Sequence, residues 1–299
     1  MTNSFSGDAM TTGPERRSVW QLWPLRLVFF FLVLATIDIG CMVVPAVLTH
    51  SVGKHADPVV LMGACAVAVV LMIFTYRLLV QVTERRSPDE LQIRKSVLPL
   101  AAGAVIGIGL FCLAYAAMAF CGVVSITGFG TTAGLGVALA TSIYAAVGEE
   151  IIFRGVIYRL FEEGFGTFAA IVVSGAIFGL IHAFNPGATL VSTLAIAFEA
   201  GILLAAAYAM SRSLWLPIGL HFGWNFTEGG IFSAAVSGGH AHGLIATTFS
   251  GPPLLTGGAF GPEASIPAVA VCVAAALVML VLAARRGEWK PMRFRFRFA

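Results

Sequence analysis

The chain has 299 residues, of which 58% are hydrophobic and 11% are charged, and its formal net charge is +3. Soluble domains carry about 25% charged residues, so this composition excludes a soluble globular protein and indicates a polytopic membrane protein. Such a small net charge gives no reason to expect a nucleic-acid partner. We expect membrane lipid to surround most of the chain.

Long apolar segments predict the fold. A helix that crosses a bilayer needs about 20 apolar residues, and eight segments predict an all-α bundle of eight transmembrane helices. They run over residues 25–48, 59–82, 97–119, 133–157, 167–184, 189–210, 214–236 and 265–284. We expect one membrane domain over 25–284, cytoplasmic tails at 1–24 and 285–299, and a multi-pass location in the cell (inner or plasma) membrane. The sequence gives no role for the Gly/Pro-rich outer loop 237–264.

Basic residues predict the orientation of this bundle. With eight spans and the N-terminus inside, 17 of the 18 Lys and Arg residues fall on the inner side, and only Lys54 falls outside. The 17 are Arg16, Arg17, Arg26, Arg77, Arg85, Arg86, Arg94, Lys95, Arg154, Arg159, Arg212, Arg285, Arg286, Lys290, Arg293, Arg295 and Arg297. Cytoplasmic loops are enriched in Lys and Arg, so both termini are predicted to be cytoplasmic.

Charged side chains inside apolar spans are informative, since burying an unpaired carboxylate is energetically expensive. The fourth predicted span contains Glu149, Glu150 and Arg154 within "AAVGEEIIFRG". Glu150 and Arg154 are four residues apart and share a helical face, with the acid before the base, which is the favourable order for such a pair. Glu149 is turned about 100° away, so it cannot easily use the same arginine.

Polar side chains in two further spans are predicted to meet Glu149. His182 lies near the end of the fifth span, and His221 lies in the seventh. The turn between the fourth and fifth spans centres near Phe165, 16 residues after Glu149 and 17 before His182. In an antiparallel hairpin both side chains are then about 24 Å from the turn, at one level. Because the fourth span is long, we expect the hairpin to project past the inner surface and the site to open toward the cytoplasm.

Small residues accompany both histidines. Small-xxx-small patterns let membrane helices pack closely. The glycines are Gly175 and Gly179 in the fifth span and Gly219 and Gly223 in the seventh. His221 shares a helical face with Asn225, and His182 with Phe178, because each pair is four residues apart.

This set of side chains suits hydrolysis. A carboxylate and a histidine can hold and deprotonate a water molecule, and a second histidine with an asparagine can donate hydrogen bonds to an oxyanion. Two histidines and a glutamate can also hold zinc with a water in the open position. Two other readings stay open, because intramembrane Glu and His residues also serve proton-coupled transport and structural hydrogen-bond networks.

Three ordered motifs resemble those of a known family. "EEIIFR" (149–154), "FGLIH" (178–182) and "HFGWN" (221–225) are similar to the EExxxR, FxxxH and HxxxN motifs of the CAAX-processing and bacteriocin-processing (CPBP) intramembrane endopeptidases. The resemblance covers about 135–230, which would be the catalytic core. The family also has eight spans. It includes type II CAAX prenyl endopeptidases and bacterial members tied to bacteriocin maturation, immunity or peptide-signal processing.

The resemblance implies a role for each motif residue. Glu149 and His182 would activate the attacking water, and His221 and Asn225 would stabilise the oxyanion. Glu150, Arg154 and Phe178 would be supporting residues.

The resemblance also implies the partners and leaves the metal open. A Zn²⁺ or another divalent ion, if one is used, would bind Glu149, His182 and His221, while a metal-free mechanism uses the same residues. The implied substrate is a membrane-associated protein or peptide, with or without an isoprenyl group. A non-catalytic role in immunity or as a scaffold is an alternative.

Overall fold

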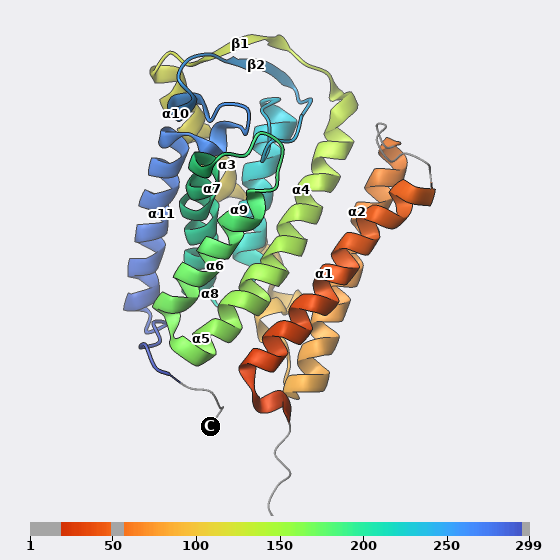
Figure 1. Ribbon diagram of the computed structural model, residues 1–299. Coiled ribbons are helices and arrows are strands. Elements are labelled where there is room, and N and C mark those ends of the chain that lie inside the picture. The colour runs from red at the N-terminus through yellow and green to blue at the C-terminus, as the bar shows by residue number, and fades with distance from the viewer. Residues whose placement is uncertain (1–18, 49–56, 295–299) are drawn as a thin grey trace, which may run out of the picture.

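The computed structural model describes residues 19–48 and 57–294 (Figure 1). It is an all-α membrane bundle, as the composition predicted, and helices occupy all eight predicted segments. The α-helices are α1 (Trp23–Leu48), α2 (Pro58–Leu79), α3 (Val97–Phe120), α4 (Leu135–Glu150), α5 (Arg159–Phe165), α6 (Thr167–His182), α7 (Leu190–Ile196), α8 (Leu203–Ser211), α9 (Trp215–Asn225), α10 (Pro253–Thr256) and α11 (Ile266–Arg285). Most of the predicted tails, at 1–18 and 295–299, lies outside the described residues.

Four stretches of π-helix interrupt or extend these helices. They are Val80–Glu84, Ile151–Tyr158, Ala197–Ile202 and Phe226–Ile231. The second joins α4 to α5 and the third joins α7 to α8, so each pair forms one continuous rod. Such π-helical stretches are frequent at functional sites, and the second begins directly after Glu150.

Six helical runs among the described residues are long and apolar enough to span a membrane. They are Trp23–Val43, Pro58–Glu84, Val97–Phe120, Thr132–Phe165, Leu190–Ser211 and Ile266–Arg285. The helix at Thr167–His182 is apolar but shorter, and α9 with its π-helical extension fills the remaining predicted segment. The count of eight spans and the orientation stay predictions.

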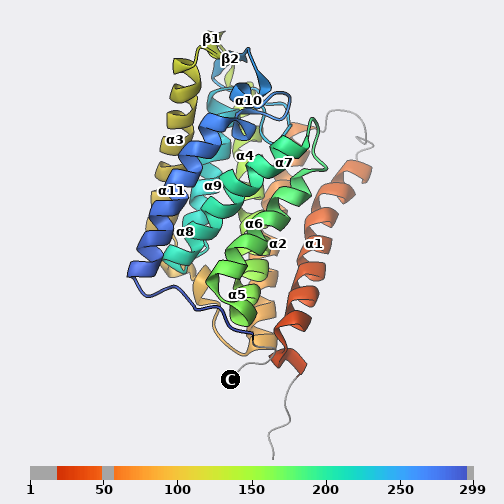
Figure 2. The same ribbon diagram turned by 60° about the vertical axis from the view of Figure 1, so that its left-hand side comes forward.

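The helices form one edge pair and a larger group. Figures 1 and 2 place α1 and α2 at one edge of the bundle, and α2 packs against α4. In the larger group α3 packs along α9, and α11 packs along α8. The α4–α5 rod therefore lies between the edge pair and the rest.

A short sheet covers one end of the bundle, which the sequence analysis did not predict. Strands β1 (Val124–Phe129) and β2 (Ile245–Phe249) pair antiparallel across more than a hundred residues of sequence. The hydroxyls of Ser125 and Thr248 are 2.8 Å apart across the pair. This strand pair lies over the end of the bundle opposite the start of α1 and the end of α11 (Figure 1).

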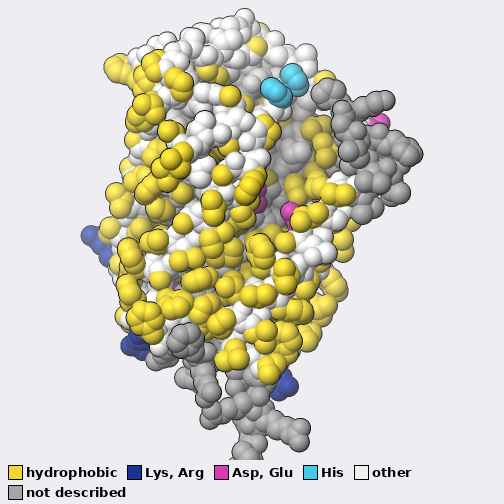
Figure 3. Space-filling view, in the orientation of Figure 1, with side chains coloured by type: hydrophobic (Ala, Val, Ile, Leu, Met, Phe, Trp, Pro, Cys, Tyr) yellow, Lys and Arg dark blue, Asp and Glu magenta, His cyan; other side chains and the backbone are white. Residues whose placement is uncertain are grey.

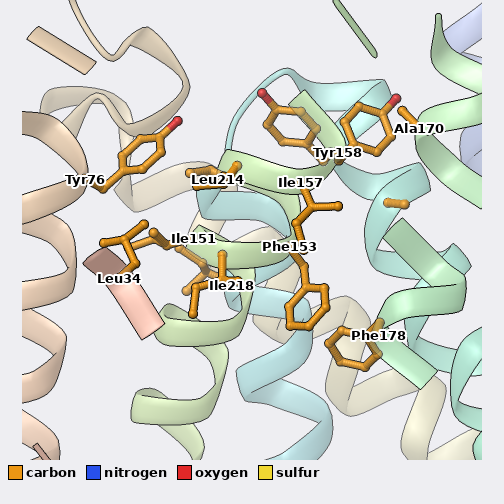
Figure 4. Packing of buried hydrophobic residues seen from close by; sticks show 14 of the residues in the cluster. Leu34, Tyr76, Ile151, Phe153, Ile157, Tyr158, Ala170, Phe178, Leu214 and Ile218 are labelled. Carbon is orange, nitrogen blue, oxygen red and sulfur yellow. The ribbon is translucent and has the colours of Figure 1, made fainter. Parts of the chain in front are cut away.

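The core surrounds the π-helical stretch Ile151–Tyr158, all of whose residues are buried. Figure 4 shows Ile151, Phe153 and Ile157 pointing into the cluster, where Leu34 and Ile218 come from other helices. The rings of Phe153 and Phe178 meet edge to face with centroids 4.9 Å apart. This apolar layer lies between Glu150 and the α5–α6 turn.

Buried ion pairs hold the opposite end of the bundle together. Arg26 contacts Glu84 at 3.1 Å, and Arg159 contacts the same carboxylate at 2.7 Å. Glu162 accepts from Arg212 at 2.6 Å and from Lys290 at 2.8 Å. These pairs link α1, α2, α5, the α8–α9 turn and the chain after α11. On the face in Figure 3, Lys and Arg side chains lie only toward this end.

Candidate active site

The structure brings the predicted residues from three helices to one cavity. Its volume is about 730 Å³, and its lining includes Glu149 from the end of α4, His182 from the end of α6, and His221 and Asn225 from α9. The equal distances counted from the α5–α6 turn therefore correctly predicted that Glu149 and His182 share a level. Figure 3 shows a hollow in this face with acidic side chains deep in it and histidines at its rim.

Glu149 and His182 face each other at the bottom of this cavity. His182 Nε2 lies 4.0 Å from Glu149 Oε2, which is too far for a direct hydrogen bond. His182 Nδ1 lies 2.7 Å from the Phe178 carbonyl oxygen, so Nδ1 carries the proton of the neutral ring and Nε2 is an acceptor. Glu149 Oε2 is buried without a hydrogen-bond partner among the described residues. Two acceptors at this separation suit one water that donates a hydrogen bond to each.

Glu150 lies in a different environment from its neighbour. Its side chain is fully buried, and Arg154 Nη1 donates to Glu150 Oε1 at 2.8 Å, as the four-residue spacing predicted. His221 Nδ1 lies 3.1 Å from the same oxygen. The Glu150 carboxylate therefore orients His221 so that Nε2 is the ring nitrogen left free for a substrate.

Phe178 connects the supporting residues. Its ring centroid is 4.6 Å from that of His182 and 6.3 Å from that of His221. The Arg154 guanidinium carbon lies 4.7 Å from the same ring centroid, within cation–π range. Arg154 also donates to the Gly201 carbonyl oxygen at 2.9 Å. Phe178 thus packs under both histidines and over the arginine.

Glycines allow the helices that carry the histidines to approach their neighbours. A Cβ on Gly219 would lie 2.1 Å from the Leu100 carbonyl oxygen, and one on Gly223 would lie 2.3 Å from that of Ala104. On α6, a Cβ on Gly179 would lie 2.6 Å from the Thr193 carbonyl oxygen. The predicted close packing beside both histidines is therefore present, and the partner of α9 is α3.

The donor set was tested for a metal. Zinc binds His nitrogen at about 2.0–2.1 Å and carboxylate oxygen at about 2.0–2.2 Å. Among the residues that the structure describes, no three His, Cys, Asp or Glu side chains are grouped so that they could hold a metal ion. His221 Nδ1 and Glu150 Oε1, 3.1 Å apart, are hydrogen-bonded to each other. As arranged, Glu149, His182 and His221 do not fit a metal.

A second group of carboxylates lies behind the site and was not predicted. A smaller cavity of about 20 Å³, room for about one water, is lined by Glu199, Glu263, His182 and His221. Glu199 Oε1 accepts from Cys272 Sγ at 3.4 Å, and Glu228 Oε2 accepts from Trp224 Nε1 at 3.1 Å. Glu199 lies within the predicted span 189–210. Glu263 follows a Gly-rich loop whose fold local patterns do not predict.

The direction of the large cavity contradicts one prediction from the sequence. We expected the site to open toward the basic end of the bundle. Instead the cavity is lined by Gly134 at the start of α4, Pro58 at the start of α2, Pro186 after α6 and the segment 236–242. All of these belong to the end opposite the ion pairs. The reason is that α6 has only 16 residues, about 24 Å, and the space beyond its last turn is the cavity.

Comparison with known proteins agrees with this geometry. The fold and the site together define the class of protein: an all-α membrane bundle with a Glu–His site between three helices. The family described as Type II CAAX prenyl endopeptidase Rce1-like matches residues 131–227, a range that contains every predicted site residue. "Putative membrane peptidase YdiL" of Bacillus subtilis (strain 168) is 32% identical over 87 residues, which is 29% of this chain and 33% of that protein. No solved structure matches the chain. The chain is therefore similar to a family of membrane endopeptidases over about a third of its length, and it spans about a third of the length of this relative.

Proposed function

We propose that this protein is an intramembrane endopeptidase that hydrolyses a peptide bond of a membrane-associated protein or peptide. The observation that carries the proposal is the pair of acceptors, Glu149 Oε2 and His182 Nε2, 4.0 Å apart at the bottom of a cavity. Similarity of residues 131–227 to the prenyl endopeptidase family supports a membrane protease, and the matched relative is named as a putative membrane peptidase.

The proposed reaction begins with the water held between Glu149 and His182. Glu149 takes one proton as the water oxygen attacks the carbonyl carbon of the scissile bond, which gives a tetrahedral oxyanion. The protonated pair then delivers that proton to the leaving amine as the C–N bond breaks. One water is consumed, and one carboxylic acid and one amine are released; the second water proton leaves on the new carboxyl group and passes to the amine, so that the products end as a carboxylate and an ammonium.

The other side of the cavity would stabilise the oxyanion. Asn225 offers side-chain N–H donors, and His221 offers Nε2 when its ring is protonated beside the Glu150 carboxylate. Positioned donors of this kind typically contribute about 10²–10³-fold to turnover. Glu150 and Arg154 act through His221 and through the helix, so they are positioning residues in this proposal.

A second candidate is a proton-coupled transporter, which the extra buried carboxylates favour. Glu199, Glu228 and Glu263 are each at most 3% exposed, and intramembrane carboxylates often carry protons. Transport requires access from both ends of the bundle. The apolar layer around Phe153 and the ion pairs beyond it favour the peptidase, because the large cavity is lined only from one end.

One experiment separates the two candidates. Purified protein and its Glu149→Gln variant would be incubated with a mixed library of membrane peptides, and products read by mass spectrometry. The same two proteins in liposomes would be assayed for pH-dependent flux. Cleavage by the wild type and not by the variant supports the peptidase. Flux without cleavage would contradict it.

A further inference from the structure

Among the residues that the structure describes, those that line the large cavity come from one end of the bundle and from its middle. The residues that line it include Pro58 and Leu61 of α2, Ala133 beside α4, and the exposed His240. None of its lining residues comes from the ion-paired loops or from the π-helical stretch after Glu150. Glu149 is one-third exposed through this opening.

The opposite end is closed by packing and by charge. Directly beyond Glu150 come Ile151, at 0% exposure, and Phe153, at 3%. Beyond them Arg159 makes ion pairs with Glu84, Glu90 and Glu163. A polypeptide approaching from this end would have to break buried ion pairs and the apolar layer, each of which is costly.

Charge assigns these two ends to the two sides of a membrane. At the closed end, Lys and Arg side chains lie at the ends of α1, α2, α5, α8 and α11. The end covered by β1 and β2 carries no Lys or Arg among the described residues. Lys and Arg in short loops favour the cytoplasmic side. The open end of the cavity then faces away from the cytoplasm.

We infer that the substrate enters from the non-cytoplasmic side. It is an extended, largely apolar peptide segment of an exported or membrane-anchored protein. This inference rests on the proposed function and narrows its substrate class. A prenylated CAAX cysteine belongs to a protein that reaches the membrane from the cytoplasm, so it meets the closed end.

The cavity wall fits such a segment. Its volume of about 730 Å³ is within the range of about 300–1,000 Å³ that ligand sites occupy. The lining includes apolar side chains such as Leu61 and Val137 and hydrogen-bonding groups such as Thr141 and Asn185. An extended backbone needs both kinds of surface, because its N–H and C=O groups must stay paired away from water.

Accessibility of single cysteines tests the inference without any substrate. In a background that lacks the other native cysteines, Ala145→Cys reports on the cavity one helical turn before Glu149. Native Cys121 is exposed at the end of α3, next to β1, and reports on the end where the cavity opens. Ser87→Cys lies in the exposed loop after α2 and reports on the basic end. Ile143→Cys, exposed on the outside of the same helix, is the matched control for a thiol that faces lipid.

A membrane-impermeant maleimide added to intact cells should label Ala145→Cys and Cys121 as fully as after permeabilisation. Ser87→Cys should react only after permeabilisation, and Ile143→Cys should not react. The inference would be overturned if Ala145→Cys, like Ser87→Cys, reacted only after permeabilisation. It would also be overturned if Cys121 reacted only after permeabilisation. Ala145→Cys that reacts from neither side would also overturn it. None of these results depends on turnover, so failure of the peptidase proposal would be recognised separately.

Discussion

Two glutamates that are adjacent in sequence occupy different environments. Glu149 faces the cavity with its side chain 33% exposed and one oxygen unpaired among the described residues. Glu150 is fully buried and is paired with Arg154 and His221. Neighbouring residues on a helix point about 100° apart, which is enough to put one carboxylate in the cavity and the other in an ion pair. Each can therefore be tested by its own substitution.

Glu149→Gln should remove the proposed base while keeping the shape of the side chain. A positioned general base contributes about 10²–10⁴-fold, so turnover should fall by that factor. The melting temperature should change little, because Glu149 makes no ion pair with Lys or Arg among the described residues. The measurement is turnover beside thermal unfolding in one detergent. Wild-type turnover in this variant would contradict the assignment.

Glu150→Ala should act mainly on stability. It leaves the Arg154 guanidinium buried without its carboxylate, and removing one partner of a buried pair costs about 3–5 kcal/mol. It also frees His221 Nδ1, so turnover should fall as well. Arg154→Ala leaves Glu150 uncompensated and should lower the melting temperature to a similar extent. If Glu150→Ala unfolds at the wild-type temperature, the pair does not have the structural role given to it here.

Residue spacing predicted part of this site. The four-residue separation predicted the Glu150–Arg154 pair, and equal distances from Phe165 predicted the level of Glu149 and His182. The contact between Glu150 and His221 was not predicted, because it depends on α9 lying beside α4. Periodicity gives the face of a helix and its depth, but not its neighbours.

At the scale of elements, close helix packing determines where the histidines lie. The α3–α9 contact depends on glycines from both helices. A Cβ on Gly103 would lie 2.2 Å from the Leu216 carbonyl oxygen, and one on Gly107 would lie 2.1 Å from that of Leu220. Backbone cannot move aside as a flexible side chain can, so any Cβ here separates the helices.

Gly219→Ala should therefore move α9 and with it the side chains of His221 and Asn225. The added Cβ would meet the Leu100 carbonyl oxygen at 2.1 Å, and overpacking typically costs about 1–3 kcal/mol. Both melting temperature and turnover should fall. Gly109→Ala on α3 is the matched control, because no atom lies within 4 Å of its Cβ and alanine favours the helix by about 0.5–1 kcal/mol. Equal effects of the two substitutions would contradict the packing argument.

Element types were predicted better than element contacts. Apolar length was enough to find the helical segments, because the long apolar runs of the sequence form helices. Strands β1 and β2 were missed because they are five or six residues long and pair across a separation of more than a hundred residues. The direction of the cavity was missed for a related reason. His182 is the last residue of α6. Counting residues from Phe165 gave the depth of His182 but not the space that lies beyond the end of the helix.

At the scale of the whole molecule, the two ends have opposite character. One end holds a network of ion pairs that joins five parts of the chain, and the other holds a short sheet and the open cavity. At the closed end, ion pairs hold the ends of α2, α5 and α8 together. The site lies between the two ends, so the ion-pair network supports it without touching it.

Glu90 makes this network sensitive to acid. It lies in the loop between α2 and α3, where it contacts Arg86 at 2.8 Å and Tyr76 Oη at 2.5 Å. Burial raises the pKa of Glu90, but the hydrogen bond from Arg86 and the charge of Arg159 outweigh it and lower the pKa from 4.5 to about 2. The unfolded chain thus takes up this proton at a higher pH than the folded chain does.

The pH dependence of the folding stability follows from that difference in proton uptake. Stability from Glu90 is fully present above pH 4.5 and is lost as the pH falls to about 2, a change of about 3 kcal/mol at 1.36 kcal/mol per unit. Glu90→Gln should be less stable than the wild type at neutral pH, and its melting temperature should fall less between pH 5 and pH 2.5, a window of roughly the titration range. Asp89→Asn, at an exposed neighbouring position, is the control and should follow the wild type. Thermal unfolding of the three proteins across this range is the measurement. If the wild type and Glu90→Gln lose stability in parallel, the proton uptake belongs to other groups and the network does not depend on Glu90.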